Sequence, residues 1–233
     1  LLICFFLMFS FNSKNFRLDA YSETLLIEGD PDLKYLNEVN QRYGSKEFLI
    51  LTFTPKEEFT SDNSINNLLS LKYKLQSLDW VHNVITILDI PLLNIKDETL
   101  TEKLQNFSTL KSEGIDRKEG FNEILNSPVF RNFVISEDGT TTGIIVNIKS
   151  TEANAKQFQS KKELQTYKDK LKEKNHNNIL EIREIIKSFS DIGKIHLGGI
   201  PMIADDMMTF IKSDIIVFGL GVFLFIILTL WYV

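Results

Sequence analysis

The longest uncharged stretch of the sequence constrains the chain most. Residues Ile215 to Val233 read IIVFGLGVFLFIILTLWYV, 19 residues without a charged side chain. At ~1.5 Å per residue they form a helix roughly 28 Å long, close to the hydrocarbon thickness of a bilayer. Each Leu, Ile, Phe or Val near its centre favours insertion by ~0.3 to 0.6 kcal/mol, and no charge opposes it. The stretch predicts a transmembrane helix rather than a buried core helix.

A second apolar stretch, Leu1 to Phe11, is also uncharged. It is too short to cross a bilayer, and it lacks the basic region and the cleavage site of a signal peptide. We therefore expect residues 1–11 to be the exit end of a first transmembrane helix and residues 12–46 to link it to the soluble part. Because Trp231-Tyr232 is an interfacial aromatic pair, we expect both ends to lie inside a longer protein.

All 57 charged residues, 26 Lys and Arg with 31 Asp and Glu, lie between Lys14 and Asp214. The middle is therefore a soluble segment between two membrane segments. A charged fraction of 24% and a hydrophobic fraction of 43% exclude a disordered or collagen-like chain. The single cysteine, Cys4, lies in the first apolar stretch, so the soluble part contains no disulfide. A loop of this length crosses the membrane largely regardless of its charge, so charge does not orient it.

The soluble part begins with a strand-helix-strand pattern. Phe48 to Phe53 (FLILTF), apolar on both faces at its start, predicts a central strand. Val81 to Leu88 predicts a second strand, so the two form a split unit with a right-handed crossover if they are parallel. Between them, apolar residues at spacings of three and four follow the cap candidates Ser61 and Asp62 and predict an amphipathic helix. These residues are Ile65, Leu68, Leu71, Leu75 and Leu78.

Residues 92–127 predict a helical insertion made of short helices, broken at Gly114 and Pro128. The apolar positions that suggest these helices are Leu100, Leu104, Phe107, Leu110, Phe121, Ile124 and Leu125. Asp138-Gly139 then predicts a hairpin turn between two strands, Phe130 to Ser136 and Thr141 to Lys149.

The pattern from residue 156 to residue 189 is helical, and the polar run Lys174 to Asn178 leaves one kinked helix or two helices open. Lys194 to Leu197 predicts a short strand. It leads through Gly198 and Gly199 to Pro201 in the first turn of the next helix.

The complete order predicts an α+β fold, a ferredoxin-like split β-α-β domain over residues 47–200 with a helical insertion. Transmembrane helices flank this domain, and residues 201–233 form the second one with its extension outside the membrane.

No catalytic motif is found: HExxH, GxSxG, a phosphate loop and CxxC are all missing from the sequence. His82, His176 and His196 lie far apart in sequence. We therefore expect no enzymatic activity, no catalytic residue, no cofactor and no metal site. The lysines between residues 156 and 174 alternate with acidic residues, which predicts a solvated helix face rather than a nucleic-acid site.

Asp205 and Asp206 are the most unusual charges, because they lie one to two turns into the helix that becomes the membrane span. Carboxylates near a helix N-terminus gain roughly 0.3 to 1 kcal/mol from the dipole, which accounts for one of them. Lys212 and Asp214 mark the boundary with water. Our hypothesis is that Asp205 and Asp206 couple the soluble domain to the membrane.

Three segments resemble a known family. Residues 22–33 (SETLLIEGDPDL), followed by Tyr43-Gly44-Ser45, are similar to the start of the first extracytoplasmic loop of MMPL-type exporters of the resistance-nodulation-division (RND) superfamily. Residues 136–141 (SEDGTT) resemble the hairpin of this family, and residues 197–206 (LGGIPMIADD) its entry into the second transmembrane helix. The helical insertion matches least.

The resemblance implies a proton-driven exporter in the bacterial inner membrane, with a periplasmic porter domain that handles hydrophobic or amphiphilic substrates, often lipids. The implied partners are membrane lipids, the substrate, the remainder of the same transporter chain and further copies of it, and no nucleic acid. Gly198, Gly199, Pro201, Asp205 and Asp206 are the implied residues of the junction between porter and membrane. The substrate-binding residues stay unknown, and the carboxylates that carry protons belong to later spans.

A second class of protein shares the layout of two spans around an extracytoplasmic α+β domain, namely a sensor kinase or chemoreceptor. In a sensor, a basic, helical signalling segment would follow the second span, whereas in an exporter further apolar spans would follow. A membrane-tethered enzyme would need a convergent polar pocket, which the sequence does not reveal.

Overall fold

The computed structural model describes residues 31, 32, 35, 38, 39, 47–93, 107–149 and 160–232. The chain divides into two compact units. The first is an α+β domain within Leu36–Ile203, and the second comprises Leu1–Tyr35 and Ala204–Val233. Residues 1–11 and most of the linker 12–46 lie outside the described residues.

A four-stranded antiparallel sheet forms the centre of the α+β domain, in the order β2-β3-β1-β4. Since every neighbouring pair is antiparallel, β1 runs parallel to β2 and β3 runs parallel to β4, and one strand separates the members of each pair. The strands are β1 (Phe48–Pro55), β2 (Val81–Ile85), β3 (Thr142–Ile148) and β4 (Gly193–Gly198). The predicted α+β class is confirmed.

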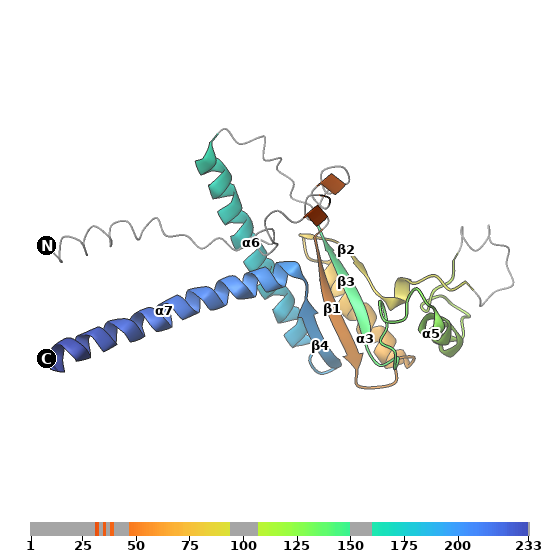
Figure 1. The fold of residues 1–233 in the computed structure, drawn as a ribbon. Helices are drawn as coiled ribbons and strands as arrows, with labels where there is room; N and C mark the ends of the chain where they lie inside the picture. The colour runs from red at the N-terminus through yellow and green to blue at the C-terminus, as the bar shows by residue number, and fades with distance from the viewer. Residues whose placement is uncertain are drawn as a thin grey trace. The chain divides into compact units, whose positions relative to one another are not determined.

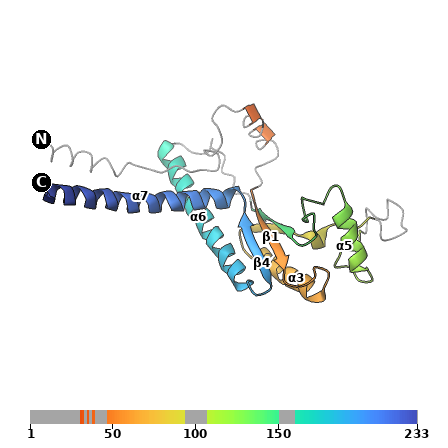
Figure 2. The ribbon, with the colours of Figure 1, turned by 60° about the horizontal axis from the view of Figure 1, so that its bottom comes forward.

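One face of the sheet forms the core. Leu49, Leu51 and Phe53 of β1 are completely buried. They lie opposite Val146, Ile144 and Thr142 of β3, and Leu51 and Phe53 also lie opposite Leu197 and Ile195 of β4. Helices α3 (Asp62–Gln76) and α6 (Lys161–Ser188) cover this face (Figure 1 and Figure 2).

Strand β1 is a central strand of the sheet, as predicted, but only one of its two apolar faces is buried. Phe48 and Ile50 are 45% and 40% exposed, while the alternating residues are buried. The physical reason is that α3 and α6 contribute to the same core, and no helix in the described ranges covers the other face of β1. Apolar residues at the start of β1 therefore predicted its position in the sheet but not its environment.

Helix α3 confirms the predicted spacing, because Ile65, Leu68, Leu71 and Leu75 are buried and the side chain of Ser61 accepts a hydrogen bond from the Ser64 amide. The second strand is shorter than predicted. It ends at Ile85, and a 3-10 helix, η3 (Ile87–Asp89), replaces residues 87–88 of the expected strand. Thr86 and Asp89 form a capping box that binds backbone amides, so these amides are not available for a strand partner.

The helical insertion is confirmed in its second half, as helix α5 (Arg117–Asn126), where the Asp116 side chain accepts hydrogen bonds at its N-terminus. The first half differs: Phe107 has no regular secondary structure, Leu110 lies in a turn, and the amide of Leu92 donates to the carbonyl of Ser108 over 2.8 Å. Leu100 and Leu104 lie outside the described residues.

The predicted hairpin is half correct. Its turn and second strand, β3, are present, but residues 130–136 form turns with Asn132 at a positive φ of 66°. The physical reason is competition for edges: β1 takes one edge of β3, and β2 takes the other from Ile145 to Ile148. A short contact remains, in which the Gly143 amide donates to the Val134 carbonyl over 2.8 Å.

Helix α6 is a single helix through the polar run that left its continuity open, and Asn178 of this run is buried. Residues 156–159 lie outside the described residues. Strand β4 occupies the predicted position, and helix α7 (Ile200–Tyr232) follows it directly. Helix α7 has the length and the composition of a membrane span. No residue in its most apolar window is buried. This is weak evidence for membrane association.

Candidate functional site

The candidate site is the junction at which the sheet passes into α7. Gly199 lies between β4 and α7 at a φ of +119°, a conformation that favours glycine. A Cβ atom on Gly199 would lie 3.2 Å from both the Leu49 Cα and the Phe48 carbonyl oxygen. The junction therefore needs glycine at residue 199, because backbone atoms of β1 limit the space.

Gly198 lies next to it under weaker constraints. A Cβ atom on Gly198 would contact only the Ile50 carbonyl oxygen, at an ordinary 3.7 Å. Of the two glycines predicted at the junction, steric reasons thus require only Gly199.

The first turn of α7 is held against α6. Pro201 is buried, and its carbonyl oxygen accepts a hydrogen bond of 2.9 Å from Nδ2 of Asn175 in the middle of α6. The amide of Ile203 donates to the Gly199 carbonyl over 3.0 Å, which closes the turn. Proline is compatible with this position because the first amides of a helix have no intrahelical partner. Asn175 is a junction residue that the sequence reasoning missed, since its side chain contacts a backbone carbonyl 26 residues away.

Asp205 and Asp206 lie in the second turn of α7, and both are half-buried. They belong to the second unit, whereas Gly198, Gly199 and Pro201 belong to the α+β domain. The structure therefore brings three of the five predicted junction residues together, and the coupling role of the two aspartates stays a prediction.

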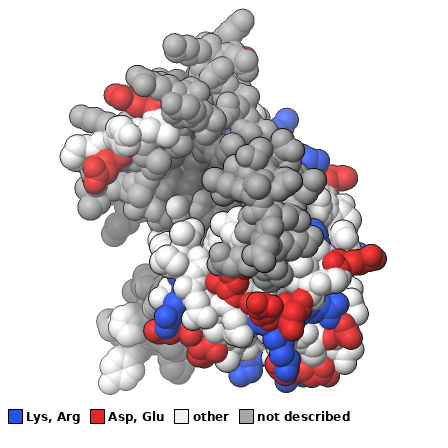
Figure 3. All heavy atoms as spheres, turned by 90° about the vertical axis from the view of Figure 1, so that its right-hand side faces the viewer, with Lys and Arg blue, Asp and Glu red and all other residues white. Residues whose placement is uncertain are grey.

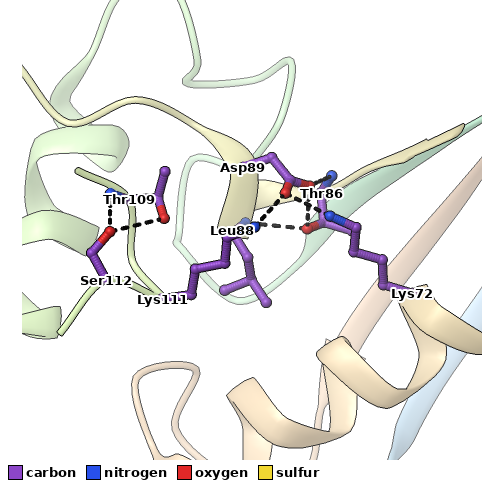
Figure 4. Close-up of polar contacts among 7 residues, drawn as sticks. All are labelled: Lys72, Thr86, Leu88, Asp89, Thr109, Lys111 and Ser112. Carbon is purple, nitrogen blue, oxygen red and sulfur yellow. Dashed lines mark hydrogen bonds and ion pairs between the residues drawn. The ribbon is translucent and has the colours of Figure 1, made fainter. Parts of the chain in front are cut away.

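A second polar site, absent from the sequence predictions, surrounds Asp89 (Figure 4). Oδ1 of Asp89 accepts hydrogen bonds from Nζ of Lys72 at 2.6 Å and from Nζ of Lys111 at 3.2 Å. Oδ2 accepts from the amide and the hydroxyl of Thr86 at 2.9 and 3.1 Å. Lys72 comes from α3 and Lys111 from the insertion, so one carboxylate joins three segments.

Two opposing effects act on the pKa of Asp89. Burial raises the pKa of this carboxyl, but the hydrogen bonds from Lys72, the Thr86 amide and Lys111 lower it further than burial raises it. Asp89 is therefore ionised at neutral pH. Because all four contacts occupy its oxygen atoms, the cluster is an anchor for the insertion rather than a reactive group.

Hydrogen bonds within the Asp138 turn also lower a pKa. The Ser136 hydroxyl, the Thr140 amide and the Thr140 hydroxyl all donate to Oδ1 of Asp138 and hold its pKa below the ordinary value. The next residue, Gly139, has a φ of +71°, so the Asp-Gly pair forms the turn that its sequence predicts.

The three histidines do not come together: His82 lies on edge strand β2, His196 on the opposite edge strand β4, and His176 on α6. No group of three or more His, Cys, Asp or Glu in the described part of the chain has the arrangement of a metal site.

The outer face of the sheet carries an apolar surface. Phe48, Ile50 and Ile85 are between 38% and 45% exposed, and Ile145 lies opposite both Ile50 and Ile85. Beside them, Nδ2 of Asn147 donates to Oδ1 of Asn83 over 2.8 Å. The sheet thus presents aliphatic and aromatic groups with one amide pair, a surface that suits contact with apolar groups.

Comparison of the sequence with protein-family models and with curated proteins finds no match to either. The function must therefore be argued from the sequence motifs and from the geometry of the junction.

Proposed function

We propose that this chain is the first periplasmic porter domain and second transmembrane helix of an RND exporter of the MMPL type, a proton-driven pump of the bacterial inner membrane. Its substrates are hydrophobic or amphiphilic molecules such as lipids. In this proposal the domain is ferredoxin-like, with membrane lipids and the rest of the transporter chain as partners, and it has no catalytic residue of its own.

One observation carries the proposal: the chain enters and leaves the α+β domain at the same place. Ile50 near the start of β1 lies opposite Gly198 at the end of β4, and Gly199 packs against the backbone of Phe48 and Leu49. A domain inserted between two consecutive membrane helices requires its entry and exit to be neighbours. The strand order β2-β3-β1-β4, with two split β-α-β units, supports the ferredoxin-like assignment.

The resemblance of two motifs supports an exporter over other proteins of this layout. Residues 136–141 form the turn before β3, and residues 197–206 form the passage from β4 into α7. The motifs that resemble those of MMPL exporters thus coincide with a glycine turn and a glycine-dependent junction, where the backbone limits which residues fit.

The first test is to sequence the coding DNA on both sides of this segment. About ten further predicted spans and a second loop of similar size would support the pump. A basic, helical signalling segment directly after α7 would contradict it and favour a sensor.

The second test determines orientation. In a Cys4→Ser background, Ser190→Cys introduces a thiol at an exposed position between α6 and β4. We expect a membrane-impermeant maleimide to label this thiol in intact spheroplasts. Labelling that occurs only after lysis would place the domain in the cytoplasm and contradict the proposal.

A further inference from the structure

A pocket of about 520 Å³ lies at the end of β1 that is remote from the junction. Three segments that are distant in sequence line it: the end of β1 with the following loop (residues 54–60), one face of α5, and the turn residues Gly139 and Thr140. Its volume falls within the range of about 300 to 1,000 Å³ found for small-molecule sites. None of the residues predicted for the junction contributes to it.

The inner part of the pocket is aromatic. The rings of Phe59 and Phe121 stack with their centroids 5.3 Å apart, and Phe59 is only 6% exposed. Gly139 is buried beside them, and a Cβ atom at this position would lie 3.4 Å from the Phe121 ring. The turn thus packs directly on the aromatic pair, which holds the apolar surface in place.

The rim of the pocket carries two carboxylates and one ammonium group. Glu57 accepts hydrogen bonds from Nδ2 of Asn63 at 3.3 and 3.2 Å, so its position is fixed from α3. Glu58 accepts from the Thr60 hydroxyl through Oε1, and Nζ of Lys118 lies 3.8 Å from the same oxygen. Oε2 of Glu58 accepts no hydrogen bond within the described ranges, so it can still bind a donor.

The charge of the rim favours a cation. Acidic and basic side chains are interspersed over the face of the molecule that carries α5 (Figure 3). The described residues on this face therefore show no broad field of one sign, and the preference must come from the groups at the pocket itself. The charged groups among the lining residues are two carboxylates, those of Glu57 and Glu58, and one ammonium group, that of Lys118. The exposed Lys118 pair with Glu58 is too weak to neutralise both acids.

We propose that this pocket binds a small organic cation with an aromatic or aliphatic body, whose apolar part contacts Phe59 and Phe121 and whose ammonium group contacts Glu57 and Glu58. This inference deepens the proposed export function and rests on it for its biological meaning, because it names a ligand class and a site within the porter domain.

The experiment measures binding without transport. The whole chain is placed in phosphatidylcholine nanodiscs, and the methyl signals of Thr54, Thr60 and Thr140 are followed by NMR. The probes are phenethylammonium, its neutral analogue 2-phenylethanol and the anion 3-phenylpropionate. We expect phenethylammonium to shift these signals with the highest affinity of the three.

Removal of the rim carboxylates and removal of the rim ammonium group should change the affinity for phenethylammonium in opposite directions. Glu57→Gln combined with Glu58→Gln should weaken phenethylammonium binding about threefold, and Lys118→Gln should strengthen it, since each exposed charge contributes modestly. Glu119→Gln is the matched control, because Glu119 lies on α5 but lines a different pocket. The affinity for 2-phenylethanol should stay the same in all variants, which separates the charge effect from any structural damage.

Three outcomes would overturn the inference: no saturable shift of the threonine methyl groups, equal affinity for the ammonium and the alcohol, or tightest binding of the anion. None of them depends on export. If the flanking DNA reveals a sensor, cation binding at this pocket can still be observed. If none of the three probes binds to the pocket, the exporter proposal is unaffected, because it rests on the geometry of the junction.

Discussion

At the residue scale, Gly199 combines a positive φ with close backbone neighbours in β1. A Cβ atom on Gly199 would lie so close to the backbone of β1 that these neighbours would have to shift by a few tenths of an ångström. A shift of Leu49 would relieve the contact only by disturbing the centre of the sheet, because Leu49 is completely buried. Gly198, one residue earlier, tolerates a Cβ atom.

We predict that Gly199→Ala lowers the free energy of unfolding by about 1 to 3 kcal/mol, the cost of placing a non-glycine residue in a sparsely populated backbone conformation. Gly198→Ala should change it by less than about 0.5 kcal/mol. Thermal unfolding of both variants, followed by circular dichroism, measures the difference. Equal melting temperatures for the two variants would mean that the backbone of β1 adapts freely.

Asp89 gives a prediction about pH. Its folded-state pKa is lowered, so its contribution to stability is complete above the unfolded-state pKa of about 3.9 and is lost as the pH falls through the folded-state pKa. Asp89→Asn should therefore cost about 1 to 2 kcal/mol at pH 7, through lost hydrogen bonds to charged groups.

The difference between wild type and Asp89→Asn should decrease as the pH falls below about 4. Urea unfolding at pH 7, 5 and 3 measures it. Asp191→Asn, at an exposed position before β4, is the control and should differ little from wild type at each pH. A cost of Asp89→Asn that stays constant down to pH 3 would show that charge does not contribute to the anchor.

At the scale of elements, a side chain of α6 fixes the start of α7. Asn175 lies in the polar run that left one kinked helix or two helices open, and the helix continues through it. The Asn175 amide group binds the Pro201 carbonyl, which accounts for one polar residue of this run. A polar stretch within an amphipathic helix can therefore mark a contact with another helix rather than a break.

We expect Asn175→Ala to lower the free energy of unfolding by about 1 kcal/mol, the net value of a typical hydrogen bond. Amide hydrogen exchange should also increase at residues 202–204, in the first turn of α7. Asn177→Ala, at an exposed position of the same helix, is the matched control. Unchanged exchange in α7 after Asn175→Ala would contradict a role of α6 at the junction.

Local sequence patterns predicted some helices and strands of the domain correctly and others incorrectly. Local patterns were sufficient for four elements: an apolar run for β1, apolar spacing for α3, apolar residues of the insertion for α5, and the short segment before Gly198 for β4. The first arm of the hairpin was wrong, since Asp138-Gly139 indicates a turn but does not say which strand lies beside β3. That depends on β1 and β2, which occupy the edges of β3.

At the scale of the whole molecule, the junction is the place where the sheet continues into α7. Helix α7 continues without interruption from Pro201 into its apolar part. Gly199 and Asn175 hold its first turn against β1 and α6. Asp205 and Asp206 lie in the next turn of α7. The coupling hypothesis therefore concerns a helix whose first turn is held by contacts within the α+β domain.

If the full-length protein is the proposed exporter, we predict that Asp205→Ala combined with Asp206→Ala reduces export by at least about fivefold, the lower end of typical coupling free energies. The melting temperature of the α+β domain should stay unchanged. Accumulation of a hydrophobic dye in cells without other efflux pumps measures export, and Asp79→Ala is the control at an exposed position of the domain. Unaltered export in the double variant would refute the coupling role.

Sequence alone determined the features that depend on neighbouring residues: the uncharged stretch of α7, the spacing in α3, the Asp-Gly turn, and the glycine-proline passage into the last helix. Only the tertiary structure decided which of the two junction glycines is required, that Asn175 binds Pro201, that Asp89 joins two lysines, and that β1 exposes one apolar face. These features arise where residues distant in sequence meet. Their energies depend on distances and burial, which local periodicity does not encode.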